Sequence, residues 1–331
     1  MKDESMTEDK QGQGPFGPVT LDEVHALCDR YRNWGKWGPD DQQGTVNYID
    51  EACVAGAASL VRTGKTISCA LPYDQDGPQN GSFGRVNPLH FMLQDGGDVA
   101  LGAQDHLARL RYTDDAIYMP LQCGTQWDAL AHIFYDGKMY NGYGVEDVTS
   151  SGATRNSIDM IADRVVGRGI LLDIPRFRGV EWLEPGTAIH DHELAACAEA
   201  QGIEPARGDI VLVRTGHIAL CRAKGEWGTY CAGDAPGLAL SSAHWLCGNE
   251  VAAVATDTWG MEVRPNELED IFQPVHVVLL VSAGMLIGEI FDLDPLAEDC
   301  AADGVYEFMF VGPPLPFTGA VGSPLNPMAV K

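Results

Sequence analysis

A regular alternation of short apolar runs and capped helical segments, in the second half of the chain, constrains the fold more than any other feature of the sequence. The apolar runs are rich in β-branched residues and bounded by turn residues, which is typical of buried strands. Four strands are therefore predicted, at residues 169–174, 209–214, 251–256 and 275–280. Two helices with clear caps are predicted as well, at residues 191–201 before Gly202 and at residues 241–247 before Gly248. Strands and helices that alternate in this way predict an α/β fold.

The first half of the chain is less regular, and two helices and one long loop are predicted in it. Thr20 and Glu23 have the spacing of a capping box, which predicts a helix that begins there and continues through Tyr31. A second helix is expected over residues 47–62. Residues 77–97 are rich in Gly, Asn and Pro, and we expect a long loop there, of the kind that often has a functional role.

The sequence also suggests how the chain is organised. Residues 1–19 combine Gly, Gln, Pro and charged residues without periodicity, so a mobile arm is expected there, followed by a single domain over residues 20–331. The first residues lack the basic and apolar regions of a secretory signal, so we expect a cytoplasmic protein. The longest apolar run, residues 275–291, is shorter than the roughly 20 residues of a membrane-spanning helix and indicates a core segment.

The charge and the cysteines exclude several classes of protein. The 331 residues include 22 Lys and Arg against 47 Asp and Glu, a net charge of −25. Such a surface repels phosphate groups, so neither nucleic acid nor an anionic membrane is an expected partner. Nine cysteines without a C-x-x-C pair indicate reduced thiols and not a zinc finger. No glycine-rich dinucleotide or Walker pattern occurs, so no nucleotide cofactor is expected.

The segment from residue 121 to 132, Leu-Gln-Cys-Gly-Thr-Gln-Trp-Asp-Ala-Leu-Ala-His, concentrates side chains that can carry chemistry. In an extended chain, Gln122, Gln126, Asp128 and His132 share one face, because side chains alternate every second residue. These four groups would then converge on one point. Taken alone the pattern is also compatible with a structural role, in which Asp128 caps a helix and the histidine is satisfied by its neighbours.

This segment resembles the signature of the metal-dependent cyclase family that includes kynurenine formamidase and isatin hydrolase, which reads His-x-Gly-Thr-His-x-Asp-x-x-x-His. Further blocks that resemble the family follow in the same order: Gly169-Ile-Leu-Leu-Asp-Ile, Gly208-Asp-Ile-Val-Leu-Val-Arg-Thr-Gly216, Ala255-Thr-Asp-Thr-Trp, Pro274-Val-His276 with Glu289, and Gly322-Ser-Pro-Leu-Asn-Pro. The resemblance covers residues 34–331. It implies a swivelling β/β/α fold with a central barrel-like sheet and peripheral helices, assembled as a homodimer or homotetramer.

The resemblance also implies a metal site, from which this chain departs. In relatives, the motif histidines and aspartate, a later histidine and a glutamate surround divalent metal ions. This chain has Gln122 and Gln126 in place of the first two histidines, and keeps the four groups that correspond to Asp128, His132, His276 and Glu289. Amide oxygens are harder and weaker ligands than imidazole, so manganese or magnesium is favoured over zinc, and a metal-free polar pocket is the alternative.

The leading hypothesis is a hydrolase that opens a cyclic amide, lactone or formamide with a metal-activated water, with His132 or Glu289 as general acid. One alternative is a metal-independent lyase, dehydratase or isomerase that uses the same two residues as acid and base. Another is a non-catalytic binding protein that has kept the pocket. A third chemistry, in which Cys123 is a nucleophile, is weakened by the alternation, which turns Cys123 away from Asp128.

The substrate is expected to be a small cyclic or aromatic molecule. Arg85, His90 and Phe91 lie in or beside the long predicted loop, from which they could close over such a ring. Trp37, in a glycine-rich N-terminal stretch, and Trp127, inside the motif, are the other predicted substrate contacts.

Overall fold

The computed structural model describes residues 19–331. The arm predicted for residues 1–19 therefore lies outside the described residues except for its last residue, and the single domain over residues 20–331 stays a prediction. The α-helices are α1 (Leu21–Tyr31), α2 (Glu51–Ala58), α3 (Gly96–Ala100), α4 (Ile174–Arg178), α5 (Asp191–Ala200), α6 (His217–Lys224), α7 (Ser242–Gly248), α8 (Pro274–His276) and α9 (Asp294–Asp303). Short 3₁₀ segments are η1 (Gly44–Tyr48), η2 (Ser82–Gly84), η3 (Tyr140–Gly142), η4 (Val145–Asp147) and η5 (Ile158–Ile161), and η6 (Val277–Ala283) is a π-helix.

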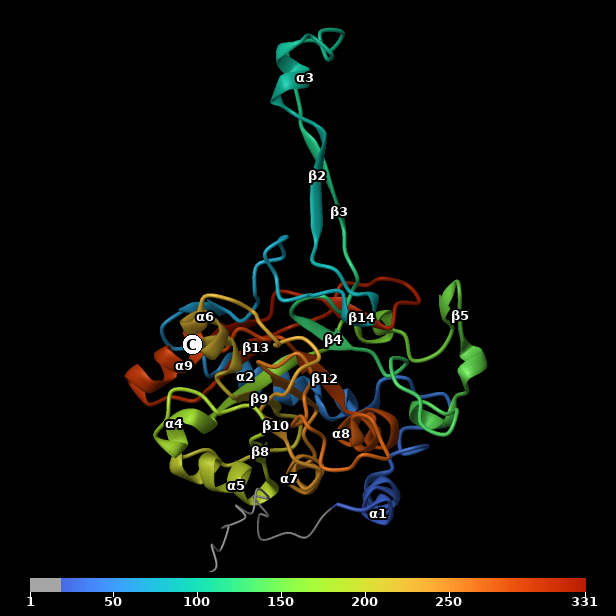
Figure 1. The fold of residues 1–331 in the computed structure, drawn as a ribbon, viewed down its shortest axis with the longest axis vertical. Coiled ribbons are helices and arrows are strands. Elements are labelled where there is room, and N and C mark those ends of the chain that lie inside the picture. Colours follow the sequence, from blue (N-terminus) through green and yellow to red (C-terminus); the bar gives the residue numbers. More distant parts are fainter. Residues whose placement is uncertain (1–18) are drawn as a thin grey trace, which may run out of the picture.

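A large curled sheet organises the molecule (Figure 1). Its strands, in spatial order, are β1 (Thr66–Ser68), β15 (Met328–Val330), β13 (Glu307–Val311), β7 (Val166–Asp173), β9 (Ile210–Arg214), β11 (Ala253–Thr256), β12 (Leu286–Glu289), β4 (Gln126–Asp128) and β14 (Gly322–Pro324). The central strands β7, β9, β11 and β12 are parallel, and the strands on both sides of them pair antiparallel. Three further pairs are small: β2 (Leu89–Gln94) with β3 (Asp114–Tyr118), β5 (Val148–Thr149) with β6 (Gly152–Ala153), and β8 (Ala188–Ile189) with β10 (Gly237–Leu238).

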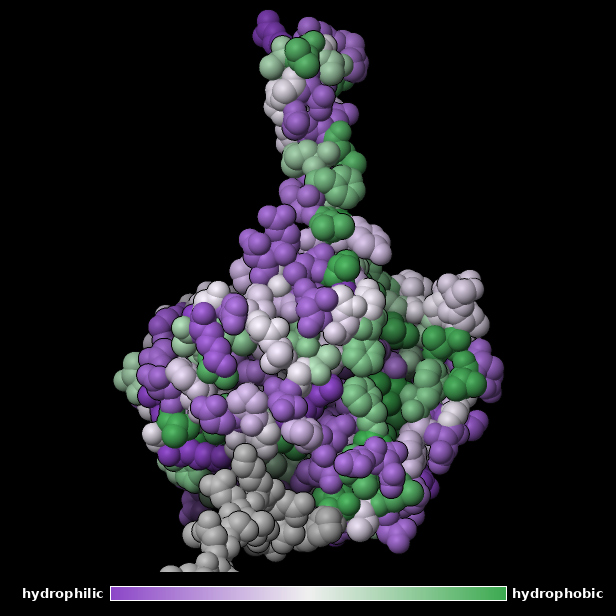
Figure 2. Space-filling model, viewed as in Figure 1, coloured by the Kyte–Doolittle hydropathy of each residue, from purple (hydrophilic) through white to green (hydrophobic). Residues whose placement is uncertain are grey.

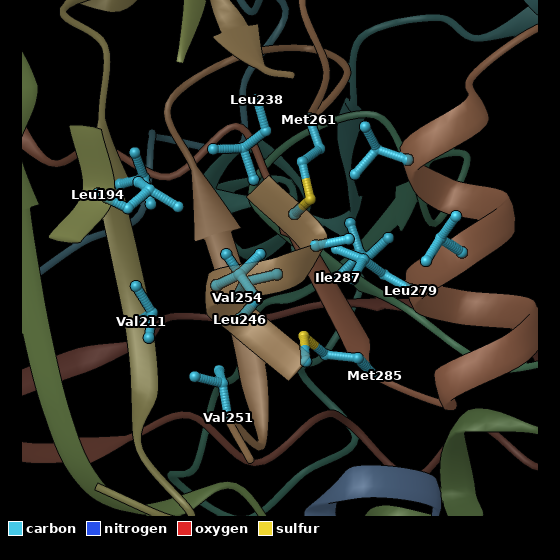
Figure 3. Packing of buried hydrophobic residues seen from close by; sticks show 14 of the residues in the cluster. Leu194, Val211, Leu238, Leu246, Val251, Val254, Met261, Leu279, Met285 and Ile287 are labelled. Atoms are coloured by element: carbon cyan, nitrogen blue, oxygen red, sulfur yellow. The ribbon is translucent and has the colours of Figure 1, made fainter. Parts of the chain in front are cut away.

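Both faces of the central strands are buried. Along β7, Ile170 and Leu172 point into one hydrophobic cluster, while Leu171 between them points into the other. Figure 3 shows the first cluster, in which Val211 and Val254 from the strands meet Leu279 from the π-helix. A parallel sheet is buried on both faces because its crossover helices cover it, which explains the continuous apolar runs in the sequence. The predicted α/β fold, with a central barrel-like sheet and peripheral helices, is confirmed.

The predicted helix at Thr20 is confirmed, and the second predicted helix is shorter than expected. Thr20 caps α1, its hydroxyl accepts a hydrogen bond from the backbone N–H of Glu23, and the Glu23 carboxylate accepts the N–H of Thr20 in return. In place of one helix over residues 47–62, the 3₁₀ segment η1 ends at Tyr48 and α2 begins at Glu51. Asp50 separates the two because its carboxylate accepts the N–H of Cys53 as an N-cap.

The strand predicted at residues 275–280 is wrong, because this segment forms α8 and η6. A fully apolar run has no polar face from which its period can be read, so a buried helix and a buried strand look alike in sequence. The residues at the two ends of the run indicate a helix more clearly than the run itself does. Pro274 occupies the first helical turn, and Gly284 ends the helix in the left-handed conformation, which is the usual asymmetry of helix ends.

The loop predicted at residues 77–97 is in part a strand of a projecting arm. Strands β2 and β3 form a hairpin that extends from the body of the molecule and carries α3 at its tip (Figure 1). Hydrophobic residues, green in Figure 2, are visible along this arm. The large apolar side chains exposed there are Leu89, Phe91, Met92, Leu93, Leu101, Leu110, Tyr112, Ile117 and Tyr118. The homodimer or homotetramer implied by the family resemblance stays a prediction. In the part of the chain that the structure describes, no helix is long and apolar enough to cross a membrane.

His217, the first residue of α6, provides a test of the packing through pH. Its ring packs on Tyr230 at 4.8 Å, and burial together with the charge of Lys224 lowers the pKa of His217 to about 4. The folded state therefore holds a neutral ring, and stability falls as the pH drops below 6.5, where only the unfolded chain gains the proton. We expect His217→Phe to remove about 2 kcal/mol of the stability loss between pH 7 and pH 5. Urea unfolding at both pH values measures this, and equal losses in the two proteins would contradict it.

Candidate active site

The candidate site lies where the central parallel strands end. Glu289 is the last residue of β12, and β4 pairs antiparallel beside it, so that Glu289 faces Gln126 and Ile287 faces Asp128. Gln126 and Asp128 point to the same face of β4, because they are two residues apart in a strand. In α/β proteins this edge of the sheet is where ligands bind. Gln126 and Asp128, two of the motif side chains predicted to converge, therefore lie at a place suited to chemistry, whereas Gln122 and His132 lie outside β4.

Two carboxylates surround a buried imidazole at this edge. The Nε2 atom of His276 lies 3.2 Å from a carboxylate oxygen of Glu289 and 3.8 Å from one of Asp128. The Nε2 atom of His132 lies 3.8 Å from the other oxygen of Asp128. Ligand atoms of Asp128, His276 and Glu289 all lie within 4.8 Å of one another, which is the arrangement of a metal-binding triad.

A third carboxylate, which sequence reasoning did not find, orients the imidazole. Glu262 is 2% exposed, and its carboxylate accepts a hydrogen bond from Nδ1 of His276 at 2.7 Å. This bond leaves Nε2 directed at Asp128 and Glu289, and a hydrogen bond of this kind fixes the ring orientation of a metal-binding histidine. Glu262 lies in the loop after β11 and His276 in α8, so no short spacing in the sequence indicates their contact. We call Asp128, Glu262, His276 and Glu289 the carboxylate–histidine cluster.

Gln126 lies against this cluster, and Gln122 lies against the strand that pairs with β4. The amide of Gln126 donates to Glu289 at 3.0 Å and, less directly, to Asp128 at 3.4 Å. Its carbonyl oxygen and the amide nitrogen of Gln122 are buried and have no hydrogen-bond partner among residues 19–331. Gln122 packs on Gly322 of β14, which is paired with Asp128 of β4. A Cβ atom at position 322 would lie 2.5 Å from the amide nitrogen of Gln122. Two buried amide atoms without a hydrogen-bond partner are unusual in a protein interior.

The environment separates the protonation states of these groups. Burial and the charge of Asp128 raise the pKa of Glu289 to about 7. Burial alone would raise the pKa of Asp128, but the charges of His132, His276 and Arg85 bring it below its usual value. Burial lowers the pKa of His132, whereas at His276 the carboxylates, Glu262 foremost, overcome burial and raise the pKa well above its usual value. Near pH 7 the site thus holds groups that can both give and take a proton.

Arg85 is the predicted substrate contact that the structure places beside the cluster. It follows η2, and its guanidinium lies over the ring of Trp259 at 5.2 Å from the centroid. Its charge lowers the pKa of Asp128 and opposes the rise at Glu289, so its electrostatic field reaches both carboxylates.

The remaining predicted contacts lie elsewhere in the chain. Trp127 is fully buried on the opposite face of β4, where it packs on Phe291 and Phe310, so it is a core residue. His90 and Phe91 lie on the projecting arm and are not part of the site that this chain builds.

Trp37, a predicted substrate contact, lies apart from the cluster, and Cys123 is unsuited to a role as nucleophile. Trp37 packs on Tyr48, which contacts Arg207 just before β9, at the opposite end of the parallel strands from the cluster. Cys123 is fully buried, and burial raises the pKa of its thiol to about 11, which opposes a role as nucleophile.

Comparison with known proteins assigns the family. Residues 40–263 match the family described as Putative cyclase. No curated protein matches the chain. Among solved structures, one described as a novel cyclase is 39% identical, with a TM-score of 0.83 over 92% of this chain and 99% of that chain.

Two more distant structures share the fold. Isatin hydrolase A from Labrenzia aggregata, solved with benzyl benzoate, is 21% identical, with a TM-score of 0.56 over 83% of this chain and 96% of that chain. Isatin hydrolase A from Ralstonia solanacearum is 19% identical, with a TM-score of 0.59 over 84% of this chain and 95% of that chain. The family match over residues 40–263 and the 39% identity over nearly the whole chain lead to one conclusion: the protein belongs to the cyclase family.

Proposed function

We propose that the protein is a hydrolase that opens a cyclic amide, a lactone or a formamide with the help of a divalent cation. The observation that carries the proposal is the buried triad of Asp128, His276 and Glu289 at the carboxyl end of the parallel strands. Carboxylates are rarely buried together without a compensating charge, because each loses its hydration. A cation at this position would supply that charge. The isatin hydrolases that share the fold are consistent with this reaction class.

The residues present fit a divalent cation. Turning the Gln126 amide by half a turn would exchange its donor for the carbonyl oxygen that now has no partner among residues 19–331. That oxygen would then face two carboxylates, which is favourable only with a cation between them. Asp128, His276 and Glu289 would hold the ion, with Gln126 as a neutral oxygen ligand. A donor set of three oxygen ligands and one imidazole favours manganese or magnesium over zinc.

When bound, the cation would lower the pKa of a water molecule and polarise the carbonyl oxygen of the substrate. Side chains of the protein would accept and donate the protons of the reaction. His132, whose pKa is lowered, is neutral near pH 7 and can accept a proton from water. The protonated His132 can then give this proton to the nitrogen or oxygen that leaves as the acyl bond breaks, while Glu289, as a ligand of the cation, would stay ionised. Glu262 keeps the proton of His276 on Nδ1 and so fixes the direction of Nε2.

Removal of the metal tests the proposal. The protein purified without added metal is expected to contain close to one divalent ion per chain by elemental analysis, and to hydrolyse at least one member of a panel of lactones, cyclic imides and formanilides. Chelation should lower this activity at least about a hundredfold, and Mn²⁺ should restore it. A metal-loaded protein that hydrolyses no member of the panel would contradict the proposal.

One observation favours a second candidate function. The Gln126 amide already donates to both Asp128 and Glu289, and so holds the carboxylates together without a cation. A metal-independent lyase, dehydratase or isomerase would then use His132 as base and Glu289 as acid. Activity that is unchanged by chelation, in a protein without bound metal, would support this candidate against the hydrolase.

A further inference from the structure

Beside the carboxylate–histidine cluster, three aromatic rings and two guanidinium groups form a second cluster. We call Phe83, Arg85, Trp259, Arg264 and Phe272 the aromatic–arginine cluster. Trp259 forms its base and is 4% exposed, whereas Phe83 and Phe272 are 68% and 52% exposed. The ring of Phe83 lies 5.5 Å from that of Trp259 and 6.0 Å from that of Phe272, centroid to centroid. Exposed phenyl rings around a buried indole form an apolar surface of the kind that ligands bind.

Both guanidinium groups contact the aromatic rings of this surface, and neither has a carboxylate partner among residues 19–331. Arg85 and Arg264 lie 5.2 and 5.9 Å from the centroid of Trp259, and Arg264 lies 5.4 Å from that of Phe272, within the range of cation–π contacts. Nη2 of Arg264 donates to the carbonyl of Ala232 at 3.1 Å, and Nη1 is buried with no hydrogen-bond partner among residues 19–331. Neither arginine forms an ion pair with a carboxylate in that part of the chain.

This lack of partners is informative because acidic residues are abundant. The chain has 47 Asp and Glu against 22 Lys and Arg, so carboxylates are available to pair with almost every basic group. A partly buried guanidinium without an anion loses hydration that a cation–π contact only partly offsets. An anionic ligand would satisfy both arginines at once.

The two clusters adjoin each other. The backbone N–H of Ile290 donates to the carbonyl of Thr258 at 2.9 Å, so Trp259 borders the end of β12 just beyond Glu289. Glu262, which holds His276, lies in the loop between Trp259 and Arg264. A ring that rests on the aromatic–arginine cluster is therefore next to the triad.

We infer that the aromatic–arginine cluster binds a planar aromatic ring that carries a carboxylate. The rings supply the stacking surface, and the planar fork of a guanidinium matches a carboxylate. A doubly charged phosphate is disfavoured because Asp128, Glu262 and Glu289 lie close by and repel it more strongly. The inference names the substrate class of the hydrolase and in that respect rests on the proposed function, whereas the binding itself does not require turnover.

Ligand-detected ¹⁹F NMR tests the inference with two probes of the same shape. 4-Fluorobenzoate carries the carboxylate, and 4-fluorobenzamide replaces it with a neutral amide. We expect the protein to bind the benzoate at least about tenfold more tightly than the benzamide, because bonds between guanidinium and carboxylate groups are charge-assisted. Equal binding of the two probes by the unaltered protein would overturn the inference without any variant.

Variants assign the preference to the arginines. Arg85→Gln combined with Arg264→Gln should reduce the preference for benzoate to within about twofold. Arg155→Gln is the matched control, because Arg155 also lies over a ring, that of Tyr143 at 5.2 Å, but outside both clusters, and it should keep the full preference. A preference that survives in the double variant would overturn the inference.

Chelation separates this site from the metal. The preference for benzoate should persist after metal removal if the arginines bind the carboxylate, and its loss on chelation would overturn the inference in favour of carboxylate binding to the ion. Benzoate binding with the expected arginine dependence, in a protein that hydrolyses nothing, would leave this inference standing and refute the proposed function.

Discussion

Replacing Asp128 with asparagine is expected to remove the bound cation and to lower kcat/KM by about 10²- to 10³-fold. Asp128 is 1% exposed and lies 3.8 Å from the Nε2 atoms of both His132 and His276. Asparagine has nearly the same volume as aspartate but lacks its charge. Its amide N–H groups would face the N–H groups of the histidines and of Gln126, so donors would meet donors. Elemental analysis and steady-state kinetics, on whichever substrate of the panel is hydrolysed, measure the two effects.

Asp209→Asn is the matched control for this prediction. Asp209 is also 1% exposed and accepts a hydrogen bond from Ala206, but it precedes β9, at the opposite end of the parallel strands. Burial raises the pKa of Asp209 to about 6, so a neutral side chain is tolerated there better than at Asp128. This variant should keep its metal and its activity. An Asp128→Asn protein that is folded, metal-loaded and as active as the control would refute the assigned site.

Replacing Asp257 with alanine is expected to lower the free energy of unfolding by about 3–5 kcal/mol, the largest loss of stability predicted for a single side chain of this protein. Asp257 follows β11, and its carboxylate accepts hydrogen bonds from the backbone N–H and hydroxyl of Thr215 and the N–H of Gly216, each at 2.7 Å. Alanine would leave these three buried donors without an acceptor, and each unsatisfied donor costs about 1–3 kcal/mol. Arg214, at the end of β9, would also lose a nearby negative charge.

Urea unfolding at pH 7.5 measures the loss. Burial raises the pKa of Asp257 to about 6, so the carboxylate is ionised at this pH. Asp257→Asn should have an intermediate effect, because its amide keeps one acceptor oxygen. Asp163→Ala is the surface control, with a carboxylate side chain that is 84% exposed, and should change stability by less than about 0.5 kcal/mol. An Asp257→Ala protein as stable as this control would show that the donors find other partners.

The regular parts of the fold were predictable because they depend on local chemistry. The Thr20 capping box, the strands at residues 169–174 and 209–214 and the helix at residues 191–201 all follow from caps, turn residues and apolar period, and the structure confirms them. The segment at residues 275–280 was not predictable by the same means, since an apolar run that is buried on every side carries no period.

The candidate site was predictable only in part, because local alternation can be inferred from the sequence but pairing between distant segments cannot. Gln126 and Asp128 share a face of β4 because alternation in a strand is local, whereas Cys123 precedes β4 and lies outside the reach of this rule. Within β4 the alternation also turns Trp127 away, into the core, which the aromatic character of the residue does not reveal. His90 and Phe91 stand in a glycine-rich stretch typical of an active-site loop, yet pairing between β2 and β3 carries them out on the arm.

The α/β class, the family resemblance and the residue types that meet at the site could all be inferred from the sequence, because they depend on composition, spacing and short-range periodicity. Long-range packing sets the other features of the site: Glu262 holds His276, and Arg85 and Arg264 both contact Trp259. It also leaves both arginines without a carboxylate partner among residues 19–331. Contacts between segments distant in the chain arise from sheet order and burial, and no spacing between residues encodes them. Protonation depends on the same contacts, since burial and neighbouring charge, and not residue type, set the pKa of Glu289 near 7.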